Sequence, residues 1–325
     1  MQGFRAPWWL PGGHAQTIWP ARLGRQEPTP GGRPLRYRRE RWTTPDGDFI
    51  DVDHLDEGAA PDAPLLVLFH GLEGSSQGLY ALAFAHWARR AGWRFVVPHF
   101  RGCSGELNLA PRAYHSGDFE EIGWILDRLR AQESAALRAV GISLGGNALL
   151  RWAEASGDAA AGVARAVAAV CSPVDLAASG RAIGRGFNRQ VYTRMFLRTM
   201  VPKALAKLTQ HPGLFSREAM LAVRDLYAFD NLFTAPLHGF ASTEDYWARA
   251  SAKPQLAQIR IPALLLNARN DPFVPAASLP KPGQVGKHVT LWQPEHGGHV
   301  GFPGGRFPGH VRSLPDGVMG WLAQA

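Results

Sequence analysis

The sequence predicts an α/β protein with a mostly parallel central sheet that helices cover on both faces. Short apolar runs typical of buried strands alternate with segments whose apolar residues follow helical spacing. A hairpin pattern precedes this alternation, and one long stretch in the second half of the chain interrupts it. Such alternation favours parallel strands joined by helical crossovers. At 325 residues, the chain is long enough for one large domain, residues 1–325, that carries an insertion.

The first predicted elements are two short antiparallel strands. Residues 38–44 and 49–55 flank the sequence Pro45-Asp46-Gly47-Asp48. This sequence suits the turn of a β-hairpin, because Gly47 tolerates a positive φ. We therefore expect a hairpin at the start of the sheet.

The parallel series follows this hairpin. Strands are expected at residues 65–69, 94–100, 138–142, 164–171, 263–268 and 288–292. Helices are expected at residues 79–90, 119–130 and 147–155. Ligands of such sheets bind at the carboxyl ends of the strands, so functional residues are expected there.

Residues 174–258 break the alternation, because they contain no clear strand and several helical patterns separated by prolines. We expect a helical cap inserted in the domain. Within it, one apolar stripe is expected from Tyr192, Met195, Phe196, Thr199 and Met200. Basic residues repeat at helical spacing beside it, as Arg194 with Arg198 and Lys203 with Lys207. A basic amphipathic helix can contact a membrane surface or an acidic substrate, but a helix packed on the domain with its charges in water is the preferred interpretation.

Composition fits a globular protein, with 46% apolar and 19% charged residues. The net charge of +8 raises the question of an anionic partner. Its densest cluster, formed by Arg33, Arg36, Arg38, Arg39 and Arg41, has no nucleic-acid-binding motif around it, so a solvated surface and no nucleic-acid partner are expected.

The cysteines and the apolar runs of the sequence bear on cellular location and membrane topology. Only two cysteines are present, Cys103 and Cys171, at the ends of different predicted strand regions. This favours a reduced cytoplasmic protein over a disulfide scaffold, with both thiols structural. No secretory signal is visible, and no apolar run approaches the roughly 20 residues that a transmembrane helix needs. Peripheral contact with a membrane is an alternative that the sequence leaves open.

The most informative motif is Gly141-Ile142-Ser143-Leu144-Gly145, between an apolar strand pattern and a helical one. A serine on such a turn, with glycines two residues away on either side, is typical of a nucleophile elbow. A second Gly-x-Ser-x-Gly match surrounds Ser76, but several loop residues separate it from its strand. Ser143 is therefore the predicted nucleophile.

A serine hydroxyl is a weak nucleophile, so it needs a histidine base and a carboxylate that orients the histidine. Asp271 follows the strand expected at 263–268, and it is preferred over Asp175, which follows the preceding strand. His299 lies in a glycine-rich loop after the last strand and is preferred over His296 as the base. The paired histidines could suggest zinc, but no third ligand cluster accompanies them, so no metal and no cofactor are expected.

Acyl transfer also needs donors for the developing oxyanion, and backbone N–H groups usually supply them. In a strand-elbow-helix arrangement, one donor is the residue after the nucleophile, here Leu144. The other comes from a loop after an early strand, and His70-Gly71-Leu72-Glu73-Gly74 fits this description. Leu72 is the predicted second donor, and His70 is expected to be a structural hydrogen-bonding residue.

Ordered motifs over nearly the whole chain resemble the YheT-like branch of the α/β-hydrolase superfamily, which also contains the abhydrolase-domain esterases and the plant EMB8-type proteins. The motifs are Pro11-Gly12-Gly13-His14-Ala15-Gln16-Thr17, Pro45-Asp46-Gly47-Asp48-Phe49, His70-Gly71-Leu72-Glu73-Gly74-Ser75, His99-Phe100-Arg101-Gly102-Cys103-Ser104-Gly105-Glu106, Tyr114-His115-Ser116-Gly117, Gly141-Ile142-Ser143-Leu144-Gly145-Gly146-Asn147, Asn270-Asp271-Pro272-Phe273 and Glu295-His296-Gly297-Gly298-His299-Val300-Gly301-Phe302.

The resemblance implies the α/β-hydrolase fold, and its triad falls on Ser143, Asp271 and His299. It implies a carboxylesterase that acts on small-molecule esters with short acyl chains, and some relatives resemble acylglycerol or phospholipid hydrolases. Three hypotheses follow: a cytoplasmic serine carboxylesterase for short- to medium-chain esters, a lipase or phospholipase working at membrane surfaces, and a non-catalytic ligand-binding homologue that keeps the fold.

Overall fold

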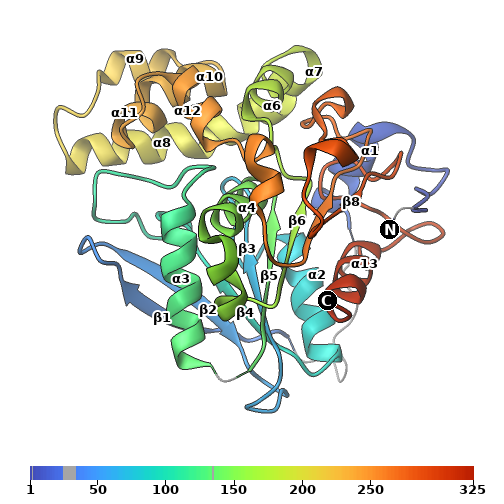
Figure 1. Ribbon diagram of the computed structural model, residues 1–325. Helices are drawn as coiled ribbons and strands as arrows, with labels where there is room; N and C mark the ends of the chain where they lie inside the picture. Colours follow the sequence, from blue (N-terminus) through green and yellow to red (C-terminus); the bar gives the residue numbers. More distant parts are fainter. Residues whose placement is uncertain (2, 25–33, 134) are drawn as a thin grey trace.

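An eight-stranded sheet forms the centre of the molecule (Figure 1). The computed structural model describes residues 1, 3–24, 34–133 and 135–325. The strand order is β1-β2-β4-β3-β5-β6-β7-β8. The strands are β1 (Arg38–Thr43), β2 (Phe49–Leu55), β3 (Leu65–Phe69), β4 (Arg94–Pro98), β5 (Leu137–Ile142), β6 (Ala166–Val170), β7 (Ala263–Leu266) and β8 (Val289–Trp292). All eight predicted strands are therefore present.

The sheet has an antiparallel edge and a parallel body. β1 pairs with β2 in antiparallel register, and β2 pairs in the same way with β4. From β4 through β8, all neighbouring strands are parallel. The hairpin turn places Gly47 at φ +78°, as the turn sequence predicts. The parallel strands direct their carboxyl ends toward one edge of the sheet.

Helices cover both faces of the sheet, because the side chains of each buried strand alternate between two apolar cores. Leu65, Val67 and Phe69 pack on the face of α3 (Phe119–Gln132) and α4 (Leu144–Ser156). Leu66 and Leu68 pack on the opposite face, against α2 (Leu79–Arg90) and α13 (Ser313–Leu322). The three helices predicted here are confirmed, although α4 begins three residues earlier than expected. The sequence analysis did not identify α13.

Residues 176–258, which we call the helical segment, contain helices and connecting loops but no strand. Its elements are α6 (Leu176–Ile183), α7 (Gly186–Asn188), η3 (Arg189–Thr193), α8 (Arg194–Gln210), α9 (Arg217–Ala222), α10 (Leu226–Phe229), η4 (Asp230–Thr234), α11 (Ala235–Leu237), α12 (Thr243–Ala250) and η5 (Lys253–Gln258). The segment joins β6 to β7, and α6 to α12 lie beyond the carboxyl ends of the strands (Figure 1). The remaining elements are α1 (Gly12–Arg22), η2 (Gly157–Ala159), α5 (Ala160–Val163), η6 (Ala276–Ser278) and η7 (Pro282–Gln284).

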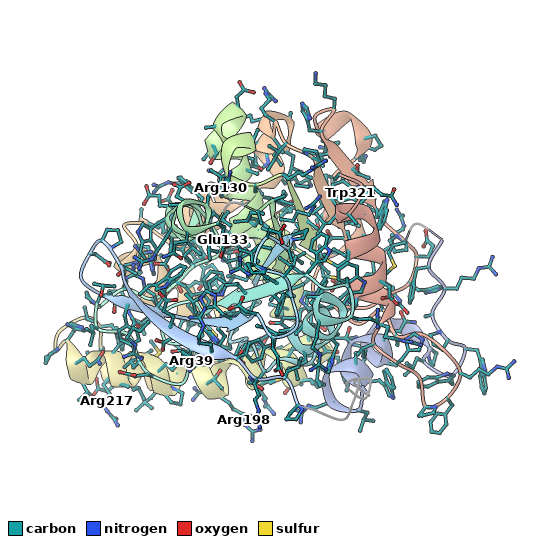
Figure 2. The ribbon with its side chains drawn as sticks, turned by 90° about the horizontal axis from the view of Figure 1, so that it is seen from below. Arg39, Arg130, Glu133, Arg198, Arg217 and Trp321 are labelled. Carbon is teal, nitrogen blue, oxygen red and sulfur yellow. The ribbon has the colours of Figure 1, made fainter. Side chains whose placement is uncertain are left out.

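The predicted basic face of α8 is only partly correct. Arg198 is exposed at the edge of the molecule (Figure 2). Lys207 is buried, and its ammonium group compensates for the loss of water by donating hydrogen bonds to backbone carbonyls of the loop at residues 108–110. Lys203 pairs with the carboxylate of Glu73 at 2.8 Å. Met195 was expected in the apolar stripe but is 41% exposed. The arginines therefore face solvent, whereas the lysines join the helical segment to the core.

Two arginines of the basic cluster at residues 33–41 form ion pairs within the molecule. Arg39 lies 2.7 Å from Asp53, and Arg41 lies 2.8 Å from Asp51. Arg33, which belongs to the same predicted cluster, lies outside the described residues. These pairs offset part of the local positive charge. Across the described part of the chain, no helix has both the length and the apolar character needed to span a membrane.

Candidate active site

Ser143 occupies a strained turn between β5 and α4. Its backbone has φ +53° and ψ −116°, a conformation that residues with a side chain rarely adopt. The flanking glycines allow the turn to pack closely. A Cβ atom on Gly141 would lie 2.4 Å from the Cα of Gly146, and one on Gly145 would lie 2.5 Å from the carbonyl oxygen of His70. The turn has the geometry expected of a nucleophile elbow.

Ser143, His299 and Asp271 form a continuous hydrogen-bonded chain. The Oγ of Ser143 lies 3.0 Å from the Nε2 of His299, and the Nδ1 of His299 lies 2.8 Å from Asp271 Oδ2. Asp271 is 5% exposed, and its other oxygen accepts the N–H groups of Phe273 and Val274. With its proton on Nδ1, directed at the carboxylate, the imidazole leaves the Nε2 lone pair for the serine hydroxyl. The arrangement is able to remove a proton from Ser143.

The alternative candidates lie elsewhere or make other contacts. Ser76 is fully buried and donates its hydroxyl to Asp53 at 2.6 Å. Asp175 caps α6 by accepting the N–H of Ala178. His296 is exposed. None of these residues joins the chain that contains Ser143.

One group near the site has metal-binding residue types. The Sγ of Cys171 and ligand atoms of Asp271 and His299 lie within 4.8 Å of one another. Both ring nitrogens of His299 already contact Asp271 and Ser143. Burial raises the pKa of the Cys171 thiol well above its usual value, so the thiolate that metals prefer is disfavoured. These three side chains therefore suit a hydrogen-bonded pair, Asp271 and His299, next to a structural cysteine, Cys171.

Leu144 directly follows Ser143, and Leu72 lines the same cavity. Among the described residues, the backbone N–H groups of Leu72 and Leu144 have no hydrogen-bond partner. The N–H of Gly71, directly before Leu72, donates instead to the hydroxyl of Tyr80 at 3.1 Å. A free N–H at the start of a helix and another in an adjacent loop can together hold an anionic oxygen. These are the two donors that the sequence predicts.

His70 is a structural residue at the start of this loop. It is fully buried, and burial lowers its pKa to about 3. Its Nδ1–H donates to the carbonyl of Gly71 at 2.8 Å, and its Nε2 accepts the N–H of Phe100 at 3.1 Å. With both nitrogens engaged, the ring fixes the backbone that leads to Leu72.

A cavity lies between the elbow and the helical segment. It holds about 1190 Å³ of empty space, its open mouth included. Ser143 and His299 lie in its wall. Most of the other lining side chains are apolar, among them Leu144, Ile183, Phe196, Met200, Leu226, Phe229, Phe233 and Phe273. The cavity therefore suits a ligand with an apolar portion next to the serine.

Residues of α1 support the loops of the acid and the base, and the sequence analysis gave them no role. Thr17 accepts the N–H of His299 at 2.8 Å. Gln16, 2% exposed, accepts the N–H of Gly297 and an amide hydrogen of Asn270, each at 2.9 Å. Both residues belong to the N-terminal motif quoted for the family resemblance. That motif was the available signal, but only the fold shows what it contacts.

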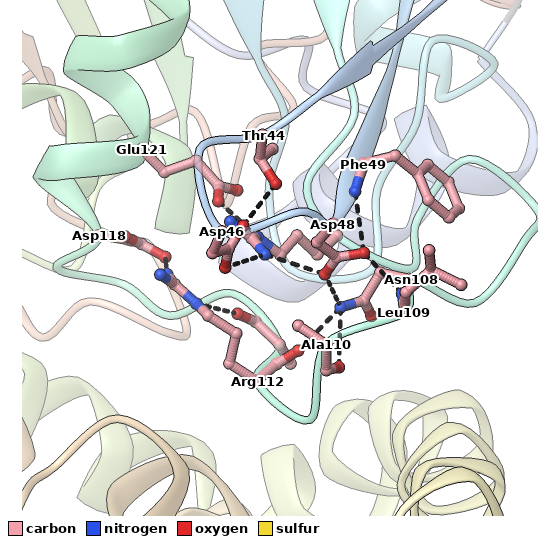
Figure 3. Close-up of polar contacts among 12 residues, drawn as sticks. Thr44, Asp46, Asp48, Phe49, Asn108, Leu109, Ala110, Arg112, Asp118 and Glu121 are labelled. Carbon is pink, nitrogen blue, oxygen red and sulfur yellow. Dashed lines mark hydrogen bonds and ion pairs between the residues drawn. The ribbon is translucent and has the colours of Figure 1, made fainter.

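The loop between β4 and α3, residues 99–118, is anchored to the hairpin by buried charges. Arg101 is 5% exposed and contacts Asp46 at 2.8 Å, Asp48 at 2.9 Å and Glu121 at 2.6 Å. Asn108 donates to Asp48 at 2.6 Å (Figure 3). These contacts fix a loop whose later residues line the cavity.

Comparison with known proteins identifies the family. The family model described as alpha/beta hydrolase fold matches residues 64–305. The chain belongs to the α/β hydrolases. It is 39% identical over 287 residues to the esterase-named protein YheT of Escherichia coli (strain K12), covering 87% of this chain and 84% of that protein. The resemblance to the YheT-like branch is thereby confirmed.

Other similar proteins are more distant. Human phospholipase ABHD3 is 29% identical over 287 residues, covering 85% of this chain and 69% of that protein. The solved structure of mouse alpha/beta hydrolase domain-containing protein 10 matches with a TM-score of 0.56 at 15% identity, covering 88% of this chain and 99% of that one. This structural likeness shows the fold.

Proposed function

We propose that this α/β hydrolase is a serine carboxylesterase that cleaves small-molecule esters through an acyl-enzyme. One observation carries the proposal: Ser143 and His299, which form a hydrogen-bonded chain with Asp271, line an apolar cavity together with Leu72 and Leu144, whose backbone N–H groups have no partner among the described residues. These are the components that acyl transfer requires.

The proposed reaction begins when Ser143 Oγ attacks the ester carbonyl and its proton passes to Nε2 of His299. The carbonyl oxygen becomes an oxyanion that accepts hydrogen bonds from the N–H groups of Leu72 and Leu144. His299 then protonates the leaving alkoxide, and an acyl-serine remains. Asp271 stabilises the imidazolium during both transfers.

Water then hydrolyses the acyl-enzyme, and His299 again transfers the proton. His299 takes a proton from a water molecule, and the resulting hydroxide attacks the acyl carbonyl. The second oxyanion occupies the same pair of N–H donors. When it collapses, the carboxylic acid leaves and the proton on His299 returns to Ser143. No metal or organic cofactor takes part in this scheme.

The helical segment acts, in this proposal, as the cap that selects the substrate. Its side chains Phe196, Met200, Leu226 and Phe229 line the cavity opposite Ser143. Their apolar surface suits the hydrocarbon part of a short- to medium-chain ester. The free and buried thiols of Cys103 and Cys171 are compatible with the cytoplasm, where we place the protein.

A lipase or phospholipase is the second candidate. Arg194 and Arg198 are exposed on α8, and Met195 and Leu221 nearby are 41% and 46% exposed. Exposed arginines beside apolar side chains favour contact with an anionic lipid surface. Relatives at 29% and 27% identity are named phospholipase and monoacylglycerol lipase. A rate that rises when long-chain substrate aggregates would favour this candidate over a soluble esterase.

The test is hydrolysis of p-nitrophenyl esters from acetate to palmitate by the wild type, Ser143→Ala and Ser76→Ala. Ser76 is a matched control because it occupies the other Gly-x-Ser-x-Gly sequence but donates to Asp53. We expect Ser143→Ala to lose about a millionfold in kcat and Ser76→Ala to remain active. Activity that survives in Ser143→Ala would refute the mechanism. A wild type inactive on every ester would favour the non-catalytic hypothesis.

A further inference from the structure

Glu73 follows the proposed oxyanion donor Leu72 and is held in an unfavourable conformation. Its φ is +55°, in the left-handed region that residues other than glycine, asparagine and aspartate rarely adopt. Such a conformation persists only where surrounding contacts impose it. The contacts that hold Glu73 therefore help to determine where the neighbouring N–H of Leu72 points.

The hydroxyl of Tyr114 makes two of these contacts. It accepts the N–H of Glu73 at 2.8 Å and donates to Glu73 Oε1 at 3.0 Å. The ring of Tyr114 stacks on Phe100, with centroids 5.1 Å apart and planes 8° apart. Tyr114 belongs to the loop that the buried Arg101 network anchors. The tyrosine thus links Glu73 to the rigid core.

The third contact comes from the helical segment. Lys203 on α8 places its ammonium nitrogen 2.8 Å from Glu73 Oε2, and the glutamate side chain is only 9% exposed. A nearly buried carboxylate depends strongly on its partner, because removal of the cation leaves an unpaired charge away from water. One turn further along α8, Lys207 binds the backbone carbonyls of Asn108 and Ala110. Both lysines therefore tie α8 to loops beside the elbow.

We propose that Lys203 and Tyr114 are positioning residues that orient the N–H of Leu72 by holding Glu73. The N–H groups on either side of Leu72 are bound by Tyr80 and Tyr114, which leaves the N–H of Leu72 for the oxyanion. Because Lys203 belongs to α8, the position of α8 on the core also affects the placement of the Leu72 N–H. The proposal rests on the proposed esterase function, because it assigns Leu72 to the oxyanion hole.

The expected effect follows from the sensitivity of catalysis to donor placement. Displacement by about 1 Å costs on the order of 100-fold in rate, and complete loss of one oxyanion donor costs about 100- to 1000-fold. Lys203→Met leaves Tyr114 in place, so a partial displacement is expected. We therefore expect kcat to fall about 10- to 100-fold with KM nearly unchanged.

The experiment compares Lys203→Met, Lys203→Arg and Tyr114→Phe with Lys253→Met as the control. Lys253 also forms an ion pair in the helical segment, 3.4 Å from Asp175, but it does not line the cavity. The readouts are kcat and KM for p-nitrophenyl butyrate, the inhibition constant of an alkyl trifluoromethyl ketone, and the melting temperature. The ketone adds to the active serine as a hemiketal oxyanion, so its affinity reports on the N–H donors.

The proposal predicts that Lys203→Met and Tyr114→Phe lower kcat and weaken ketone binding by similar factors, whereas Lys203→Arg restores most of both. Lys253→Met should match the wild type. Three outcomes would overturn it: an unchanged kcat in Lys203→Met, a rise in KM alone, or a lower kcat with unchanged ketone affinity. If Lys203→Met does not fold, Tyr114→Phe decides by the same criteria. Activity surviving in Ser143→Ala would instead refute the esterase mechanism itself.

Discussion

Gly145→Ala tests the packing between the elbow and the proposed oxyanion loop. The new Cβ would lie 2.5 Å from the carbonyl oxygen of His70 and 2.6 Å from that of Phe69. Real Cβ atoms essentially never make contacts under 3.0 Å, so the two backbones must separate by about half an ångström or more. Because Leu72 lies two residues beyond His70, its N–H group moves relative to Ser143.

The magnitude follows from two separate effects of the same methyl group. Overpacking in a well-ordered site typically destabilises the folded state by about 1–3 kcal/mol. A displaced oxyanion donor should lower kcat by about 100-fold, which is far more than this loss of stability explains while the protein stays folded. We therefore expect Gly145→Ala to melt a few degrees lower and to be nearly inactive.

The assay measures kcat on p-nitrophenyl butyrate and the melting temperature for Gly145→Ala and a matched control, Gly320→Ala. Gly320 lies in α13, and a Cβ there would meet nothing within 4 Å. The control should keep full activity and gain up to about 1 kcal/mol from helix propensity. Wild-type kcat and melting temperature in Gly145→Ala would refute the close packing of elbow and loop described above.

Three further predictions concern the acid, a buried carboxyl group and the loop anchor. Asp271→Asn should lower kcat by about 10⁴-fold, because an amide carries no charge to stabilise the imidazolium and can hold the histidine in the wrong tautomer. Asp175→Asn should leave kcat nearly unchanged, and steady-state kinetics of both variants decide between the two carboxylates. Burial raises the pKa of Glu154 to about 8, so the folded protein retains a proton that the unfolded chain releases above about pH 4.5. The free energy of unfolding should therefore decline between about pH 4.5 and pH 8, by up to about 1.4 kcal/mol per pH unit. Glu154→Gln should flatten that decline in urea unfolding at pH 5 to 8, and an equal slope in both proteins would contradict the assignment. Arg101→Met should cost about 3–5 kcal/mol in chemical unfolding because it leaves buried carboxylates unpaired, and a loss below 1 kcal/mol would show that the network contributes little.

The parallel strands and the chain of Ser143, Asp271 and His299 could be predicted because their signals are local. A buried strand such as β3 is a continuous apolar run, and the elbow is a spacing of glycines around one serine. The candidate acid and base lie in the loops that follow β7 and β8, so strand order brings them to one edge of the sheet.

What the sequence did not reveal depends on contacts between distant residues. Lys203 and Lys207 repeat at the spacing of a solvated helical face, and only the fold places loop carbonyls and Glu73 within their reach. Likewise, no local signal predicts the two partners of Gln16 Oε1, Asn270 and Gly297, because they lie more than 250 residues along the chain. Side-chain bonds to such remote backbone cannot be read from periodicity.

The bonds from α1 to the histidine loop have a consequence for the order of folding. Thr17 accepts the N–H of His299 across 282 positions of sequence, so the loop cannot gain this support until synthesis has passed His299. An emerging polypeptide could pair β3, β4 and β5 and present Ser143 well before its base is fixed. We expect hydrolytic activity to appear late, after bulk secondary structure has formed, so that the reaction itself reports the docking of α1 on the histidine loop.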